Sequence, residues 1–209
     1  MPGMSSDLGA VVAACEDFYR EHGLPPRFRI LSFLPPFLDV SLQDRGYERE
    51  SETRTLCAAD LMKVKASPGP ELAEKASPEW IKGAAAAQGR DRVASDTTAR
   101  ILAGLRIPVL FASCRNAQGE VVSFAYGAMT DGRICIESVV TRPDHRGRGF
   151  ARNMVSALMA WGHAQGAREA ILQVQAENHA AIRLYQSLGF SRELYRYHYR
   201  TLWPDRSRG

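Results

Sequence analysis

Residues 139–152 constrain the fold of this chain most, because they join a β-branched run to a helical pattern through a basic, glycine-rich turn. The segment reads V-V-T-R-P-D-H-R-G-R-G-F-A-R, and Pro143 ends the β-branched run. Gly147 and Gly149 allow the main chain to come close to a ligand, and free N–H groups at a helix N-terminus favour phosphate oxygens. Positive charge is added by three arginines, Arg146, Arg148 and Arg152. The segment therefore predicts a turn that binds the pyrophosphate of a coenzyme.

The composition is that of a globular protein. The 209 residues are 45% hydrophobic and 24% charged, which suits one large domain or two small ones. The net charge of +4 and the pI near 9.0 suit an anionic coenzyme and do not by themselves imply nucleic acid. The sequence has neither a run of 18 apolar residues nor a signal peptide in residues 1–7, so no membrane association is expected. Four widely spaced cysteines predict reduced thiols, no zinc site and a cytoplasmic protein: Cys15, Cys57, Cys114 and Cys135.

Hydrophobic periodicity and turn residues predict alternating helices and strands. In the first part we expect a helix, a strand, a second helix and a polar edge strand at residues 8–22, 27–33, 37–45 and 47–57. The prolines and glycine of residues 66–78 predict a linker. Further on we expect helices at 80–87 and 97–105, strands at 107–113, 121–129 and 134–141, a helix after the glycine turn, a strand at 170–174, a helix at 178–188 and a strand at 190–201.

The first part of the chain echoes the end of the second. Gly23 and Gly46 are 23 residues apart, as are Gly166 and Gly189, and each pair brackets a strand and a helix. At the repeat offset of 143 residues, the position that matches Arg146 is a glycine. We therefore expect residues 1–66 to be a degenerate partial repeat with a structural or substrate-shaping role, and residues 67–209 to be the catalytic domain.

Two motifs make residues 80–200 resemble the GNAT superfamily of acetyl-CoA-dependent N-acetyltransferases. One is R/Q-x-x-G-x-G/A, present at residues 146–151 with Pro143 before it. The other is N-x-x-A-x-x-L-Y-x-x-x-G-F, present at residues 178–190. The resemblance implies an α/β GNAT fold, in which helices flank a mixed central sheet. It also implies that the sheet splays between two parallel strands, here 134–141 and 170–174, with the coenzyme in the gap.

The resemblance also implies roles for individual residues. Tyr185 would protonate the leaving thiolate, since a phenol matches the pKa of a thiol better than a carboxylic acid does. The thioester carbonyl would be polarised by backbone N–H groups of Val139, Val140 and Thr141. The rest of the coenzyme would be bound by Arg146, Gly147, Arg148, Gly149, Phe150, Ala151, Arg152 and Asn178.

The general base is less clear, because the superfamily has two carboxylate positions. In ribosomal-protein acetyltransferases a glutamate stands five residues before the motif asparagine, and Gln173 occupies that position here. In aminoglycoside acetyltransferases an acidic residue stands nine residues before the motif arginine, and that position is Glu137. We favour Glu137, acting directly or through a water. Strand alternation would place Glu137 on one face with Val139 and Thr141.

Each candidate has a structural alternative. The two glycines could form a tight turn without a ligand, Asn178 could cap a helix, and Tyr185 could pack in the core. Glu137 could form an ion pair with an arginine, since a carboxylate in an apolar strand needs a partner or water. His145 is expected at the surface, together with His163 and His179.

Three other functions compete with that of an acetyltransferase. A dinucleotide-binding oxidoreductase is disfavoured because Arg152 occupies the third glycine position of its fingerprint. A nucleic-acid-binding protein is disfavoured because the basic residues are scattered, and Arg200, Arg206 and Arg208 are expected in a solvated tail. A non-catalytic acetyl-CoA sensor or assembly module stays open.

We therefore expect an acyltransferase that moves the acetyl group of acetyl-CoA to a primary amine by direct attack in a ternary complex. A covalent acetyl-enzyme is not expected, because neither motif contains a cysteine. The acceptor is more consistent with a small molecule than with a protein. We expect neither a metal nor nucleic acid nor a membrane as a partner, and a homodimer stays open.

Overall fold

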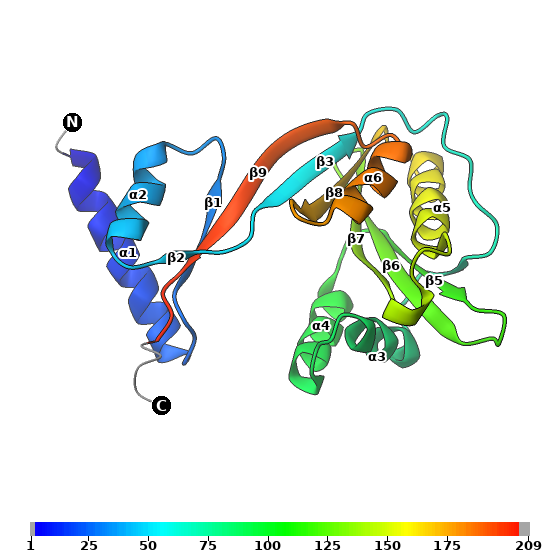
Figure 1. The fold of residues 1–209 in the computed structure, drawn as a ribbon, viewed down its shortest axis with the longest axis horizontal. Coiled ribbons are helices and arrows are strands. Elements are labelled where there is room, and N and C mark those ends of the chain that lie inside the picture. The colour runs from blue at the N-terminus through cyan, green and yellow to red at the C-terminus, as the bar shows by residue number, and fades with distance from the viewer. Residues whose placement is uncertain (1–2, 205–209) are drawn as a thin grey trace. The chain divides into compact units, whose positions relative to one another are not determined.

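A computed structural model of the chain describes residues 3–204, with side chains from Leu8 onward. Figure 1 shows its helices and strands. In chain order they are α1 (Gly3–Glu21), β1 (Arg27–Leu31), α2 (Pro36–Asp44), β2 (Glu48–Arg49), β3 (Thr53–Ala58), β4 (Glu71–Ala73), α3 (Pro78–Ala87), α4 (Arg92–Gly104), β5 (Val109–Arg115), β6 (Val121–Thr130), β7 (Arg133–Thr141), the 3-10 turn η1 (Pro143–His145), α5 (Phe150–Ala164), β8 (Glu169–Gln175), α6 (His179–Ser187) and β9 (Arg192–Thr201).

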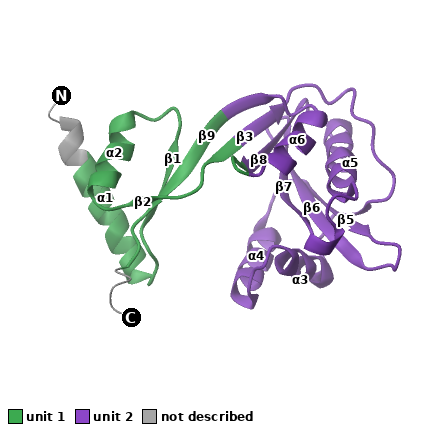
Figure 2. Cartoon of the chain, viewed as in Figure 1, with its two compact units in different colours: residues 1–54, 175–177, 195–209 green, residues 55–174, 178–194 purple. Residues whose placement is uncertain are grey.

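The chain divides into two compact units, which Figure 2 shows in different colours. Unit 1 comprises residues 1–54, 175–177 and 195–209, and unit 2 comprises residues 55–174 and 178–194. Strands β3, β8 and β9 therefore have residues in both units. Strand β9, near the end of the chain, pairs with β1 and β2 of unit 1. The expected domain boundary between residues 66 and 67 stays a prediction.

Unit 2 contains a mixed sheet with the strand order β3–β8–β7–β6–β5–β4. Strands β7 and β8 are parallel, whereas β4, β5, β6 and β7 pair antiparallel in succession. The turn between β6 and β7 contains Asp131 and Gly132, both with positive φ (47° and 69°), as the D-G signal predicts. Strand β4 lies within the segment 66–78 that we expected to be a linker, and it pairs with β5 from Glu71–Ser113 to Ala73–Phe111.

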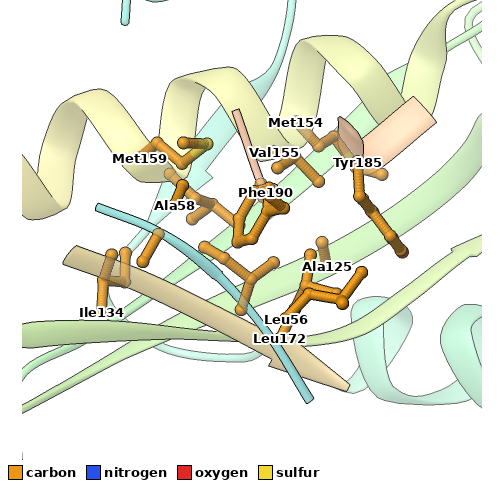
Figure 3. Close-up of a cluster of buried hydrophobic side chains, with 14 of the residues drawn as sticks. Leu56, Ala58, Ala125, Ile134, Met154, Val155, Met159, Leu172, Tyr185 and Phe190 are labelled. Atoms are coloured by element: carbon orange, nitrogen blue, oxygen red, sulfur yellow. The ribbon is translucent and has the colours of Figure 1, made fainter. Parts of the chain in front are cut away.

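Helices cover both faces of this sheet (Figure 1). On one face α5 and α6 form the α5-side core, whose members include Ala125, Ile134, Met154, Leu158, Leu172, Tyr185 and Phe190 (Figure 3). On the other face α3 and α4 form the α3-side core, whose buried members are Trp80, Ala84, Leu102, Phe111 and Phe124. The expected α/β architecture, a mixed sheet flanked by helices, is therefore confirmed.

Unit 1 pairs β1 and β2 antiparallel with β9 around a small core that contains Val12, Leu42 and Tyr47. Arg200 lies in β9 and is 5% exposed. Its Nε and Nη2 donate to the two carboxylate oxygens of Asp39 at 2.7 and 3.0 Å. The prediction that Arg200 belongs to a solvated tail is wrong, because β9 continues through it; Arg206 and Arg208 lie outside the described residues.

The echo between the two parts of the chain has a counterpart in the order of elements. Helix, strand, helix and strand follow one another in α1–β1–α2–β2 and again in α5–β8–α6–β9. The four glycines of the echo all have positive φ: Gly23, Gly46, Gly166 and Gly189. That residues 1–66 are a degenerate partial repeat of the second part stays a prediction. Within the described residues, no helix combines the length and the apolarity that crossing a membrane requires.

Candidate functional site

The glycine-rich turn lies between the end of β7 and the start of α5. Its glycines, Gly147 and Gly149, have φ angles of 76° and 84°, a conformation that glycine adopts at little cost. A Cβ added at either position would meet no protein atom within 4 Å. The main chain of the turn therefore borders open space, as a close approach by a ligand requires.

Helix α5 begins without a side-chain cap. Helices α3, α4 and α6 each start at a residue whose side chain accepts a backbone N–H, namely Ser77, Asp91 and Asn178. The residue before α5 is Gly149, which has no side chain to accept one. The first N–H groups of α5 are therefore available to an anion, and the helix dipole favours negative charge there.

Asn178 caps the N-terminus of α6, as its structural alternative predicts. Its Oδ1 accepts the backbone N–H of Ala181 at 3.1 Å, which fixes the first turn of α6. The residue is exposed, so the cap does not bury its amide. A contact between Asn178 and a coenzyme stays a prediction.

Three exposed arginines surround the turn and keep their charge unneutralised. Arg146 Nε donates to the carbonyl oxygen of Thr141 at 3.3 Å, and Arg148 Nη2 donates to that of Asp144 at 3.2 Å. Arg152 Nη2 donates to Ser187 Oγ at 2.5 Å. None of the three has a carboxylate partner among the described residues, so the turn carries excess positive charge that suits a pyrophosphate.

Strands β7 and β8 separate beside the turn. Their parallel register runs from Arg133–Glu169 to Ile136–Leu172. Glu137 and the residues after it in β7 lie beyond this register, as does Gln173 in β8. The expected separation between two parallel strands is therefore present, and the backbone of β7 from Glu137 onward has an edge that β8 does not pair.

A β-bulge interrupts β7 at this point. Tyr126 of β6 pairs with Glu137 and Phe124 pairs with Val140, so that Ala125 alone faces Ser138 and Val139. Ser138 has a φ of 54°, which is rare for a residue with a side chain and marks local backbone strain.

The bulge corrects the expected arrangement of the site. Because the extra residue reverses the alternation of side chains, Glu137 does not share a face with Val139 and Thr141. Val139 packs against the α5-side core, whereas Val140 packs against the α3-side core. Glu137 pairs with Tyr126, whose ring also packs against the α3-side core, so Glu137 lies on that face.

Glu137 is half-buried beside aromatic rings. The Tyr126 ring lies 5.5 Å from that of Phe111 and 6.3 Å from that of Trp80, centre to centre. Burial raises the pKa of Glu137, and burial together with the charge of Glu137 raises the pKa of Tyr126 to about 12. Within the described residues Glu137 has no hydrogen-bond or ion-pair partner, so the alternative of an arginine partner finds no support there.

Tyr185 lies in the α5-side core and is 6% exposed. Its ring centre is 6.0 Å from that of Phe190, and Figure 3 shows the hydroxyl end pointing away from Phe190. Burial raises the pKa of Tyr185 to about 12, so the phenol keeps its proton at neutral pH. The ring packs as a core residue, and a catalytic role for the hydroxyl stays a prediction.

Sequence reasoning missed two residues around the site. His145 was expected at the surface but is buried, with 9% of its surface exposed, because η1 turns its ring towards Asn116. Tyr126 was not considered, although counting outward from the Asp131–Gly132 turn pairs it with Glu137.

Two surface cavities lie elsewhere in unit 2. One of about 230 Å³ is lined by residues of β4, α3 and β5, including Trp80, Phe111 and Arg115. The other, of about 380 Å³, is lined by residues 59–62 together with His163 and residues 166–168. Neither contains a predicted site residue. Within the described part of the chain, no group of histidine, cysteine and carboxylate side chains could hold a metal ion.

Comparison with known proteins gives a family match over half of the chain. The model of the acetyltransferase (GNAT) family matches residues 84–190, which include both motifs. The chain is 26% identical over 190 residues to the uncharacterized N-acetyltransferase YobR of Bacillus subtilis (strain 168), covering 88% of this chain and 76% of YobR. It is 35% identical over 94 residues to the L-amino acid N-acyltransferase MnaT of Escherichia coli (strain K12), covering 44% of this chain and 54% of MnaT. Aminoglycoside N(6')-acetyltransferase type 1 of Salmonella typhimurium is 27% identical over 107 residues, covering 50% of this chain and 70% of that protein.

Solved structures show the same fold. A GCN5-related N-acetyltransferase from Sphaerobacter thermophilus superimposes with a TM-score of 0.70 at 21% identity, covering 97% of this chain and 70% of that one. A tandem GNAT protein from the clavulanic acid biosynthesis pathway superimposes with a TM-score of 0.66 at 17% identity, covering 94% of this chain and 70% of that one.

Proposed function

The chain belongs to the acetyltransferase (GNAT) family and is an acyltransferase, and from this premise we propose that it transfers the acetyl group of acetyl-CoA to a primary amine. The observation that carries the proposal is the separation of β7 from β8 directly before an uncapped helix with a glycine-rich, arginine-rich entry. A non-catalytic acetyl-CoA sensor remains the second candidate, because Gln173 stands where one branch of the family has its base.

The residues of the turn fit a coenzyme pyrophosphate. The backbone amides of residues 147–151 would hold the phosphate oxygens, since α5 has no side-chain cap to compete for them. The guanidinium groups would add charge-assisted hydrogen bonds: Arg146, Arg148 and Arg152. The unpaired edge of β7 supplies backbone N–H groups for the thioester carbonyl among Val139, Val140 and Thr141.

We assign proton transfer to two side chains on opposite faces of the sheet. Glu137, half-buried next to Tyr126, would take a proton from the ammonium form of the acceptor, directly or through a water. Tyr185 would give its proton to the leaving thiolate. Its raised pKa makes it a weak acid, but it ensures that the proton is present at neutral pH.

Direct attack by the amine is favoured over a covalent acetyl-enzyme. The cysteine two residues before Glu137, Cys135, is half-buried, and burial raises the pKa of its thiol. Burial also raises the pKa of Cys114 to about 11. Because the thiolate is the reactive form of cysteine, both thiols are poor nucleophiles at neutral pH.

A small amine is the favoured acceptor. The half-buried carboxylate of Glu137 lies among aromatic rings, where a compact ammonium group reaches it more readily than a side chain of a folded protein does. Two of the similar proteins are named for small substrates, an L-amino acid N-acyltransferase and an aminoglycoside acetyltransferase. These names favour an amino acid or an amino sugar as the first candidates.

The test is release of coenzyme A thiol from acetyl-CoA in the presence of a panel of amino acids, amino sugars, polyamines and peptides. We expect amine-dependent thiol release and a mass increase of one acetyl group on one class of small amine. Binding of acetyl-CoA without turnover on any amine would favour the sensor. Absence of acetyl-CoA binding would refute both candidates.

A further inference from the structure

The side chain of His145 links the phosphate-binding turn to a neighbouring hairpin. His145 ends η1, two residues before Gly147, and its side chain is 11% exposed. Its Nε2 lies 3.2 Å from Nδ2 of Asn116, which begins the hairpin turn between β5 and β6. The side chains of Arg146 and Arg148 donate to main-chain oxygens close by in the sequence, those of Thr141 and Asp144, whereas the side chain of His145 contacts a residue of the β5–β6 hairpin.

Asn116 is a rigid anchor for this contact. Its Oδ1 accepts the backbone N–H groups of Gln118 and Glu120 at 3.0 and 2.9 Å. The hairpin is also closed by main-chain hydrogen bonds between Asn116 and Glu120 and between Gly119 and Asn116, at 2.9 and 3.0 Å. Because Oδ1 accepts these two N–H groups, Nδ2 lies on the other side of the amide, where it donates to Glu120 Oε2 at 2.8 Å and also contacts His145.

This orientation fixes the tautomer of His145. Nδ2 of Asn116 can only donate, so Nε2 of His145 must accept, and the ring proton belongs on Nδ1. Nδ1 lies 3.0 Å from the Oδ1 carboxylate oxygen of Asp144, a separation typical of a charge contact, although its angle is not that of a hydrogen bond. The ring is therefore held between the hairpin and the carboxylate of its own turn.

We propose that His145 is a positioning residue for coenzyme binding, which anchors the turn to the β5–β6 hairpin and keeps the amides of residues 147–151 in place for the pyrophosphate. The inference rests on the proposed function. The turn contains two glycines and few contacts of its own, so without an anchor it would lose conformational freedom when the coenzyme binds. The anchor restricts the turn before the coenzyme binds, so less conformational entropy is lost on binding. It therefore affects the affinity for the coenzyme and leaves the chemical step unchanged.

The experiment compares two replacements of His145 in the full chain. His145→Phe keeps the ring volume and loses the acceptor, whereas His145→Gln offers an amide oxygen to the same Asn116 donor. We expect H145F to raise KM and Kd for acetyl-CoA about 3- to 10-fold, the worth of one neutral hydrogen bond, with kcat changed less than about 2-fold. H145Q should restore most of the affinity. His163→Phe, at an exposed histidine of α5, is the matched control and should change neither constant.

Asn116→Ser tests the same contact from the other side, because a serine oxygen can still accept the hairpin N–H groups while the amide donor is lost. N116S should raise the KM for acetyl-CoA by a similar factor. If H145F does not fold, the result for N116S tests the inference by itself. Wild-type affinity in both H145F and N116S would overturn the inference, as would an equal loss in H145F and H145Q, which would indicate packing alone. A wild-type chain that does not bind acetyl-CoA would instead refute the proposed function, and with it the inference.

Discussion

Replacement of Gly149 by alanine separates the proposed role of the turn in ligand binding from its role in stability. Gly149 has a φ of 84°, and an added Cβ would meet no protein atom within 4 Å. The folded protein therefore pays only for the left-handed backbone, which costs a non-glycine residue about 1–2 kcal/mol. For a chain of this length that corresponds to a decrease in Tm of about 2–8 °C.

The effect on coenzyme binding should be larger than the effect on stability. The added Cβ points into the space beside the amides of the turn, where a pyrophosphate has to come close. Losing one hydrogen bond to a charged group costs about 1.5–3 kcal/mol, which corresponds to an increase in Kd for acetyl-CoA of about 10- to 100-fold.

Gly166→Ala is the matched control. Gly166 follows the other end of α5, has a φ of 90° and likewise has no protein atom within 4 Å of an added Cβ. It should therefore show the same decrease in Tm and an unchanged Kd. The assay is isothermal titration calorimetry with acetyl-CoA, together with thermal melts of both variants. An unchanged Kd in G149A, or an equal loss of affinity in G166A, would refute the assignment of the turn to the pyrophosphate.

The remaining predictions concern proton transfer and stability. Glu137→Gln should lower kcat about 10²- to 10⁴-fold and remove the acidic limb of the pH–rate profile. In the wild type the midpoint of that limb should lie above the usual pKa range of glutamate, because burial raises the pKa of Glu137. Because the pKa of Glu137 is raised in the folded state, the ionised carboxylate destabilises the fold increasingly as pH rises through that pKa. Glu137→Gln should therefore raise Tm at neutral pH and lose this gain in acid. An equal Tm for the variant and the wild type at neutral pH would contradict the burial argument. Tyr185→Phe should lower kcat about 10²-fold with KM for acetyl-CoA nearly unchanged, and unaltered turnover would exclude Tyr185 as the acid. Asp39→Asn should lower the free energy of unfolding at neutral pH by about 1–3 kcal/mol, because it leaves the guanidinium of Arg200 buried without a carboxylate. Hydrogen bonding to Arg200, and then contact with His198, holds the pKa of Asp39 well below its usual range. This stabilisation is present above the usual aspartate pKa and is lost as pH falls through the lowered value, so urea melts of D39N and wild type should converge only in strong acid.

Local chemistry made most of unit 2 predictable. The D-G turn at residues 131 and 132 fixed the hairpin, and glycine at position 149 fixed the start of α5. Periodicity identified the strand that contains Glu137 and the helix that contains Tyr185, but the bulge at Ser138, which decides the face of Glu137, has no such signal. The family motifs added the separation of the parallel strands, which no local pattern indicates.

Long-range pairing made the rest unpredictable. Arg200 resembles a tail residue because it is a charged residue close to Arg206 and Arg208. It is buried because Asp39, far away in the sequence, accepts its hydrogen bonds with both carboxylate oxygens. The burial of His145 was missed for the same reason, because its partner Asn116 is distant in the sequence and lies in the β5–β6 hairpin. Strand β4 was missed because prolines and glycine surround its three residues, and only pairing with β5 makes them a strand.

The bulge at Ser138 has the largest consequence for the proposed function, because it assigns the two residues proposed for proton transfer to different faces of the sheet. Without it, Glu137 would share the α5-side face with Val139 and compete there with Tyr185 and the coenzyme. With it, Glu137 lies on the α3-side face next to Tyr126, and the backbone edge of β7 lies between the two. An amine that approaches from the α3 side would then reach the thioester through the gap beyond Ile136 and Leu172. Acceptor selectivity should therefore respond to substitutions in α3, α4 and Tyr126, while coenzyme affinity responds to the turn and α5. A substitution of Tyr126 that changed the KM for acetyl-CoA and left that for the amine unaltered would contradict this division.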